Sequence, residues 1–131
     1  MSKRRFATIL GLLLLIIGIL GFVPALIWPA QGGALAMDSA HGLLFGIFPV
    51  NAAHNGVHVL FGLWGLAAAR SARGAMLYAR AVAILYSLLT LMGMIPGLDD
   101  LFGLMPLYGN DLWLHAGIAA TSGYFGWAHL S

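Results

Sequence analysis

The stretch LFGIFPVNAAHNGVH, residues 44–58, decides the fold because the chain contains it twice. It returns as LFGLMPLYGNDLWLH at residues 101–115, at a constant offset of 57 residues. An internal repeat of this kind indicates duplicated supersecondary units that pack against each other. We therefore expect two similar structural units in one chain.

Ionisable side chains stand at matching places in the two copies. His54 aligns with Asp111, and His58 aligns with His115. Each pair is spaced i,i+4, which places both side chains on one face of a helix. Ionisable groups inside apolar segments are energetically expensive and usually mark functional positions. These two pairs are therefore the candidate site.

The composition places the chain among membrane proteins. Hydrophobic residues make up 61% of the chain and charged residues only 8%, whereas roughly a quarter of the residues of a soluble domain are charged. The net charge of +2 comes from only six Lys and Arg residues, which argues against a nucleic-acid partner. Cysteine is absent, so a metal would need nitrogen and oxygen ligands.

Hydropathy predicts one domain over residues 1–131, an all-α integral membrane bundle of four transmembrane helices. The spans are expected at about residues 6–27, 49–69, 77–95 and 112–128, each near the roughly 20 residues that a bilayer requires. LGFVP at 20–24 also resembles MGMIP at 92–96. The duplication is therefore expected to cover two helical hairpins, which would be parallel repeats with a shared orientation.

The apolar stretch at the start of each repeat copy precedes the second and the fourth span. It is too short to cross a bilayer and too apolar for a free loop, so we expect a turn or a short interfacial helix there. Pro49 is suited to the first position of the second helix, and Asn110 is a good N-cap for the fourth.

The charges predict the orientation of the four spans. All six basic residues lie before the first span or around the connection between the second and third spans, and the four aspartates lie in or beside the other two connections. The positive-inside rule then predicts a multi-pass protein of the bacterial cytoplasmic (inner) membrane with both termini cytoplasmic. A signal peptide cleaved near Ala34–Ala36 is the alternative for the first span, but its apolar run is longer than a signal core.

The second span carries a polar stripe that must face protein. Its members, spaced i, i+3, i+4 and i+7, are Asn51, His54, Asn55 and His58. In an up-and-down bundle the repeat axis would bring this stripe to Asp111 and His115 of the fourth span, in the outer half of the bilayer.

A transition-metal ion is one interpretation of this cluster. Imidazole and carboxylate ligands suit Zn, Fe or Cu, and His54, His58, Asp111 and His115 would supply three nitrogens and one carboxylate.

A b-type haem is the second interpretation, with His58 and His115 as its axial ligands. For either cofactor, Asn51 and Asn55 are expected to hydrogen-bond the ligands and fix the imidazole tautomers.

Two further interpretations involve no cofactor. The cluster could be an interhelical hydrogen-bond network in a structural or accessory subunit of a larger membrane complex or homo-oligomer. A proton path is less favoured, because the stripe continues below His58 as Gly and Ala. No nucleophile with a positioned base is apparent, which leans against an enzyme and leaves the question open. His41 is a weaker candidate for the site.

HNGVHVLFGLWGLAAAR and the later GNDLWLH are similar to motifs of a known family. The chain resembles small bacterial four-helix membrane proteins catalogued as domain of unknown function 4383, whose members carry FPVNxxHNxVHxxxGxxGLAAAR and DxWLH. The resemblance implies a four-helix membrane fold but no activity. It also implies a set of characteristic positions: Asn51, His54, Asn55, His58, Asp111 and His115.

Overall fold

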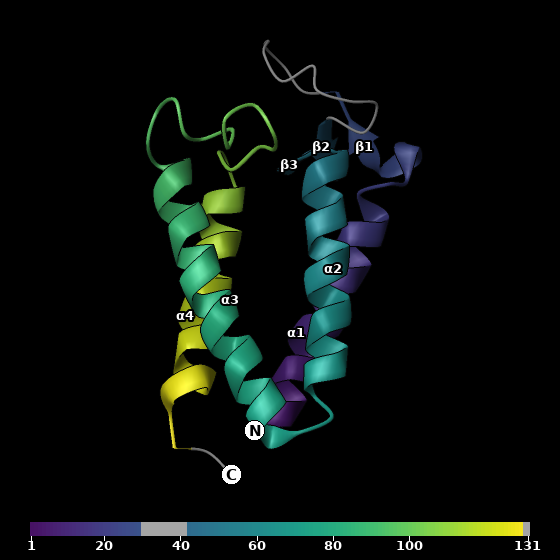
Figure 1. Cartoon of the computed structure of the whole chain (residues 1–131). Coiled ribbons are helices and arrows are strands. Elements are labelled where there is room, and N and C mark those ends of the chain that lie inside the picture. Colours follow the sequence, from purple (N-terminus) through teal and green to yellow (C-terminus); the bar gives the residue numbers. More distant parts are fainter. Residues whose placement is uncertain (30–41, 130–131) are drawn as a thin grey trace.

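The computed structural model describes residues 1–29 and 42–129. Within these residues the chain is mostly helical, as predicted, with four α-helices, and it also contains a small sheet that the sequence did not predict (Figure 1). The elements in chain order are α1 (Lys3–Leu20), the 3-10 turn η1 (Pro24–Leu26), β1 (Ile27–Trp28), β2 (Gly42–Leu44), β3 (Phe48–Val50), α2 (Ala52–Ala68), α3 (Ala72–Gly93) and α4 (Asp111–Trp127).

The helices form two hairpins, α1 with α2 and α3 with α4, that stand beside each other (Figure 1). The start of α1, the α2–α3 connection and the end of α4 lie at one end, which we call the N-terminal end. The sheet and the α3–α4 connection lie at the other, which we call the sheet end. The hairpins meet at the N-terminal end, where the rings of Phe6 and Phe125 stack with centroids 4.4 Å apart.

Glycines let α1 and α2 approach almost backbone to backbone. A Cβ atom on Gly11 would lie 2.9 Å from the carbonyl oxygen of Gly62, and one on Gly62 would lie 2.5 Å from the backbone nitrogen of Leu15. Both distances are shorter than a carbon atom tolerates, so only glycine fits this crossing. Close contacts of this kind are typical of helices that associate through van der Waals packing.

The sequence repeat is also a repeat of backbone conformation. Phe45 and Phe102, which the 57-residue offset aligns, have positive φ angles of 54° and 58°. The following glycines, Gly46 and Gly103, have φ angles of 72° and 82°. Left-handed conformations are uncommon for a phenylalanine, so their recurrence at aligned positions supports the duplication independently of the residue matches.

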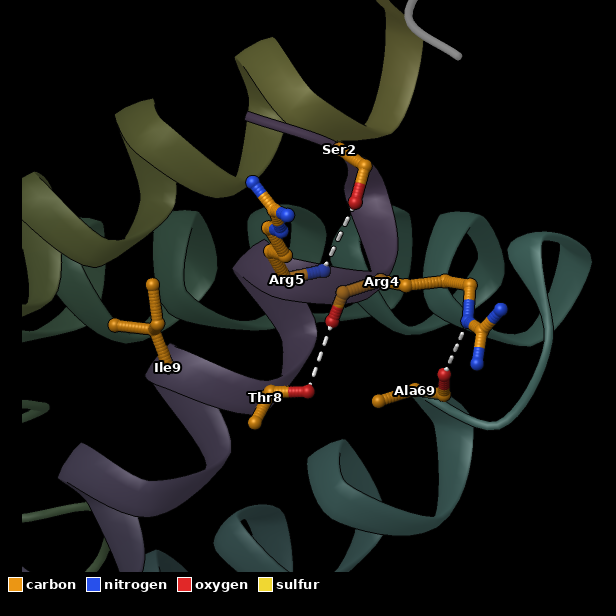
Figure 2. A pocket seen from close by; sticks show the side chains of 6 residues that line it. All are labelled: Ser2, Arg4, Arg5, Thr8, Ile9 and Ala69. Carbon is orange, nitrogen blue, oxygen red and sulfur yellow. Dashed lines mark hydrogen bonds between the residues drawn. The ribbon is translucent and has the colours of Figure 1, made fainter.

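Arginine side chains hold the C-terminal ends of α2 and α4. Arg4 Nε donates to the carbonyl oxygen of Ala69 at 2.8 Å, and Arg80 Nε donates to that of Gly126 at 2.8 Å. The repeat offset aligns Ala69 with Gly126, and a cation there complements the negative end of the helix dipole. Figure 2 shows Arg4 reaching the carbonyl oxygen of Ala69; both residues line a pocket together with Ser2, the N-cap of α1.

Several predicted boundaries were wrong. α1 ends at Leu20 rather than near residue 27, because the chain turns at Gly21 and Pro24 then begins η1. α2 does not start at Pro49, because Pro49 lies in β3, where it pairs with Leu43. The N-cap of α2 is Asn51.

The apolar stretch of the first repeat copy, expected as a turn or a short interfacial helix, contains a turn at residues 45–47 that joins β2 and β3 into a hairpin. β1 pairs with β2, and β2 pairs with β3, both antiparallel. The equivalent stretch of the second copy, residues 99–107, forms no strand: it consists of turns up to residue 104, followed by a bend and two residues without regular structure.

One of the four helices, α3, meets the length and hydropathy expected of a membrane span. Among the described residues, α3 alone is long and apolar enough to cross a membrane by length and composition, with 22 residues and a mean hydropathy of 1.7. α2 and α4 have 17 residues each, and the 18 residues of α1 begin with three basic ones. The proposed cleavage site at residues 34–36 lies outside the described residues, as does His41.

The α1–α2 crossing predicts opposite effects for two glycines of the same helix. Gly62→Ala should lower the free energy of unfolding by about 1–3 kcal/mol, because the added Cβ meets the backbone of α1. Gly56→Ala should leave it unchanged or raise it by up to about 1 kcal/mol, because a Cβ there meets nothing within 4 Å and alanine favours helix. Thermal unfolding followed by circular dichroism measures both; equal effects would contradict the proposed close contact.

Candidate metal centre

Three histidines and one aspartate are buried where the two hairpins face each other. His54 and His58 lie one turn apart on α2, and His115 lies one turn after Asp111 on α4. Their exposed fractions are 2%, 2%, 1% and 0% in the order His54, His58, His115, Asp111. The start of α2 is fixed by Asn51, whose Oδ1 accepts a hydrogen bond from the His54 backbone N–H at 2.8 Å.

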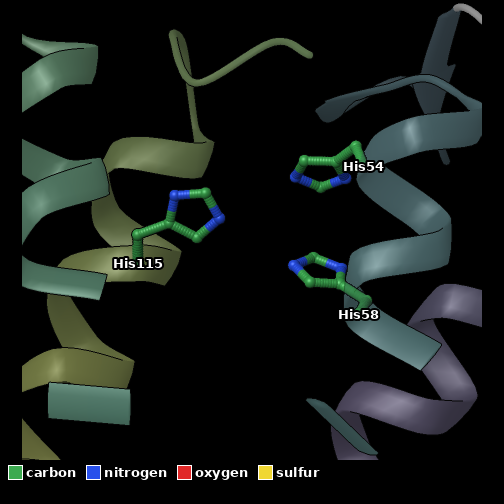
Figure 3. A group of neighbouring side chains, drawn as sticks. All are labelled: His54, His58 and His115. Carbon is green, nitrogen blue, oxygen red and sulfur yellow. The ribbon is translucent and has the colours of Figure 1, made fainter. Parts of the chain in front are cut away.

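The three imidazole rings converge on one another from opposite hairpins (Figure 3). One nitrogen from each ring lies within 4.8 Å of the other two. The ring centroids are 4.3 Å apart for His54–His58, 5.9 Å for His54–His115 and 6.1 Å for His58–His115. Ligands of a tetrahedral zinc ion are about 3.4 Å apart, so small side-chain rotations would bring these nitrogens to coordination distance.

Asp111 lies beside this group without joining it. Its Oδ2 is 3.3 Å from Nε2 of His54, but the contact lacks hydrogen-bond geometry. The set of mutually close ligand atoms contains the three histidines and not Asp111. The structure thus brings together three of the four predicted ligands and places the fourth against only one of them.

Most polar atoms of the cluster have no hydrogen-bond partner among the described residues. They are both ring nitrogens of His54 and His115, Nδ1 of His58 and both carboxylate oxygens of Asp111. A buried polar group without a partner costs about 1–3 kcal/mol. A metal ion would satisfy one nitrogen of each ring, where the three rings come together.

Contacts at both ends hold the hairpins around the cluster. On the sheet side, Asn51 Nδ2 donates to the carbonyl oxygen of Leu104 at 2.9 Å, and Asn110 Nδ2 donates to that of Ile47 at 3.2 Å. On the other side, a Cβ on Gly65 would lie 2.8 Å from the Tyr78 ring. The histidines are therefore enclosed between two regions of direct contact.

The two asparagines of the polar stripe bond to the backbone. Besides capping α2, Asn51 links the first hairpin to the α3–α4 connection through Leu104. Asn55 Nδ2 donates to the carbonyl oxygen of Gly21 at 2.7 Å and ties α2 to the end of α1. These hydrogen bonds position α2, whereas we had expected them to fix the imidazole tautomers.

A haem does not fit this arrangement. A macrocycle ligated by His58 and His115 would lie in a plane between the two rings and extend sideways from its iron by several bond lengths. The His54 ring lies 4.3 Å from the His58 ring and 5.9 Å from the His115 ring, so it occupies the same slot. The donor set is suited to a single ion.

One further residue of the cluster, Tyr86 of α3, was not predicted from the sequence. Its ring centroid is 5.2 Å from that of His115 and 6.5 Å from that of His58. Its side chain is 1% exposed, and its hydroxyl has no hydrogen-bond partner among the described residues. A sequence pattern that could have indicated Tyr86 is the i, i+4, i+8 spacing of Tyr78, Val82 and Tyr86. This spacing places the three side chains on one helix face, and all three are buried.

A protein-family model described as Domain of unknown function (DUF4383) matches residues 4–128. No curated protein and no solved structure matches the chain.

Asn51 is predicted to stabilise the protein through two separate hydrogen bonds. Asn51→Ala should lower the free energy of unfolding by about 2–3 kcal/mol, because it removes the N-cap and the bond to Leu104. Asn51→Ser should lower it by about 1 kcal/mol, because serine keeps the cap and loses only the second bond. Denaturant titration measures both values; equal losses would show that the Leu104 bond contributes nothing.

Proposed function

The chain belongs to the DUF4383 family, a family of unknown function, and we propose that it is a membrane protein that binds a transition-metal ion between its two helical hairpins. The proposed ligands are His54, His58 and His115. The observation that carries the proposal is the convergence of three buried imidazoles within 4.8 Å, with most of their nitrogens unpartnered.

Ligand chemistry narrows the metal to a few candidates. Neutral imidazole suits Zn, Fe and Cu, whereas Mg and Ca prefer oxygen ligands. Asp111 is 3.3 Å from His54, and its carboxylate would orient that imidazole.

The alternative is a hydrogen-bond network in an accessory subunit of a larger membrane assembly. Such a network needs each buried donor paired with an acceptor. Nδ1 of His54 and both ring nitrogens of His115 have no such partner among the described residues, which favours the metal instead. A homo-oligomer or a larger complex stays a prediction.

Apolar surface on all four helices supports four membrane spans. Large hydrophobic side chains are exposed along each of them, for example Leu13 at 52%, Leu60 at 67%, Leu88 at 52% and Trp113 at 79%. Helices of 17 residues are about 26 Å long, near the roughly 30 Å thickness of the hydrocarbon core.

The charges support the proposed orientation. Arg4 lies at the N-terminal end with the α2–α3 connection, to which it is hydrogen-bonded. At the sheet end, partial burial and, after it, the charge of Asp99 raise the pKa of Tyr108. A basic end and an acidic end fit the bacterial inner membrane with both termini cytoplasmic.

Metal analysis of the purified protein tests the site. Elemental analysis after growth with Zn, Fe and Cu should give close to one ion per chain, and His58→Ala and His115→Ala should each reduce this at least tenfold, because two imidazoles hold an ion much more weakly than three. The matched control is His129→Ala, which removes an exposed histidine outside the cluster. A metal-free unaltered protein that cannot be loaded with Zn, Fe(II), Co(II) or Cu would refute the proposal.

Labelling of single introduced cysteines tests the membrane topology. The chain contains no cysteine of its own, so only the introduced one can react. With a membrane-impermeant maleimide, Leu104→Cys at the sheet end should react in intact spheroplasts. Ala72→Cys at the start of α3 should react only after permeabilisation. Both positions are exposed; the reverse pattern would invert the orientation, and labelling of both in intact spheroplasts would contradict the four spans.

A further inference from the structure

Tyr86 brings a hydrogen-bond donor to a cluster that otherwise contains imidazoles and a carboxylate. Its ring packs edge-on to His115, at an interplanar angle of 87°, and lies nearly parallel to His58, at 11°. The ring is thus in contact with ligands from both hairpins. Phe61 closes another side of it, with centroids 5.8 Å apart.

The hydroxyl of Tyr86 has no structural use among the described residues. It is buried and unpartnered. Tyr78, two turns earlier on α3, shows the contrasting case, because its hydroxyl donates to the carbonyl oxygen of Phe61 at 3.0 Å. A buried phenol normally finds a partner, so the Tyr86 hydroxyl is a donor available to a ligand bound beside the histidine rings.

The three-histidine set leaves room for such a group. An ion held by three protein ligands keeps a fourth position for water or another small ligand. A metal draws electron density from that ligand, and an anion bound there is stabilised by a nearby hydrogen-bond donor. Asp111, when ionised, can only accept hydrogen bonds, so it cannot be that donor.

We propose that the metal site takes a small anion, such as hydroxide or azide, at its fourth position, and that the Tyr86 hydroxyl donates a hydrogen bond to it. This inference rests on the proposed metal site. The proposal names small anions as the ligands of the metal site and makes Tyr86 the residue that positions them from the α3 side.

Azide titration of the Co(II)-loaded protein, followed by visible absorption, tests this assignment. Tyr86→Phe should leave the cobalt stoichiometry at the level of the unaltered protein and raise the azide dissociation constant about tenfold, the effect of one lost hydrogen bond to a charged group. Tyr78→Phe is the matched control and should leave the azide constant unchanged, because it removes a hydroxyl already bonded to the backbone.

Stability of the metal-free protein separates a ligand-binding role from a structural one. Tyr86→Phe should melt at the same temperature as the unaltered protein or higher, because it removes a buried hydroxyl without a partner. Tyr78→Phe should melt lower. If Tyr86→Phe cannot be purified folded, Tyr86→Met replaces it; failure of both variants to fold would show that the role is structural and overturn the inference.

The remaining outcomes are distinct from one another. Cobalt binding with no spectral response to azide would overturn this inference and leave the metal site standing. An azide constant that Tyr86→Phe does not change would also overturn the role of Tyr86. A chain that binds no cobalt would refute the proposed function and this inference with it.

Discussion

The structure depends on one constraint: three imidazoles and a carboxylate are kept away from water between two hairpins, and they find few partners there. Each unpartnered buried group opposes folding by about 1–3 kcal/mol, so the rest of the molecule must hold the hairpins together against this cost. It does so on both sides of the cluster, through stacked Phe6 and Phe125 at the N-terminal end and through Asn51 and Asn110 at the sheet end. A bound metal ion would offset the cost of burying these groups, because a ligand that binds only the folded state adds to its stability.

Rigid hairpins make such a cluster possible. The crossing of Gly11 and Gly62 brings α1 and α2 into backbone contact, and Asn55 ties α2 to Gly21 at the far end of α1. His54 and His58 therefore sit on a helix that is held at both ends and cannot turn away easily. Binding sites on fixed helices are more accurate than sites on loops, so the distances between rings are set by how the two hairpins dock, not by local flexibility.

The sequence predicted the parts of this arrangement that follow from periodicity and duplication. The four helices follow from hydropathy, and the meeting of His54, His58 and His115 follows from i,i+4 spacing in two repeat copies; the structure confirms both. The sheet was missed because strands of two or three residues are too short to show alternation. Tyr86 was missed because it lies on α3, outside the repeated motif. The separation of Asp111 from the imidazole set depends on rotamers and on the angle between hairpins, which no spacing rule specifies.

The two hairpins have diverged in a way that makes the cluster one-sided. The 57-residue offset aligns His58 with His115, so this histidine is present in both copies. It aligns His54 with Asp111, so the two copies together supply three imidazoles rather than four. The offset that aligns residues 20–24 with 92–96 also aligns Leu14 with Tyr86, and both are buried at 1% exposure. The first hairpin thus has an apolar side chain where the second has a phenol. A symmetric structural ion would need no such difference, whereas a metal with one exchangeable ligand needs a donor on one side only. The divergence therefore favours a site that binds a small ligand from the α3 side over one that merely joins the hairpins.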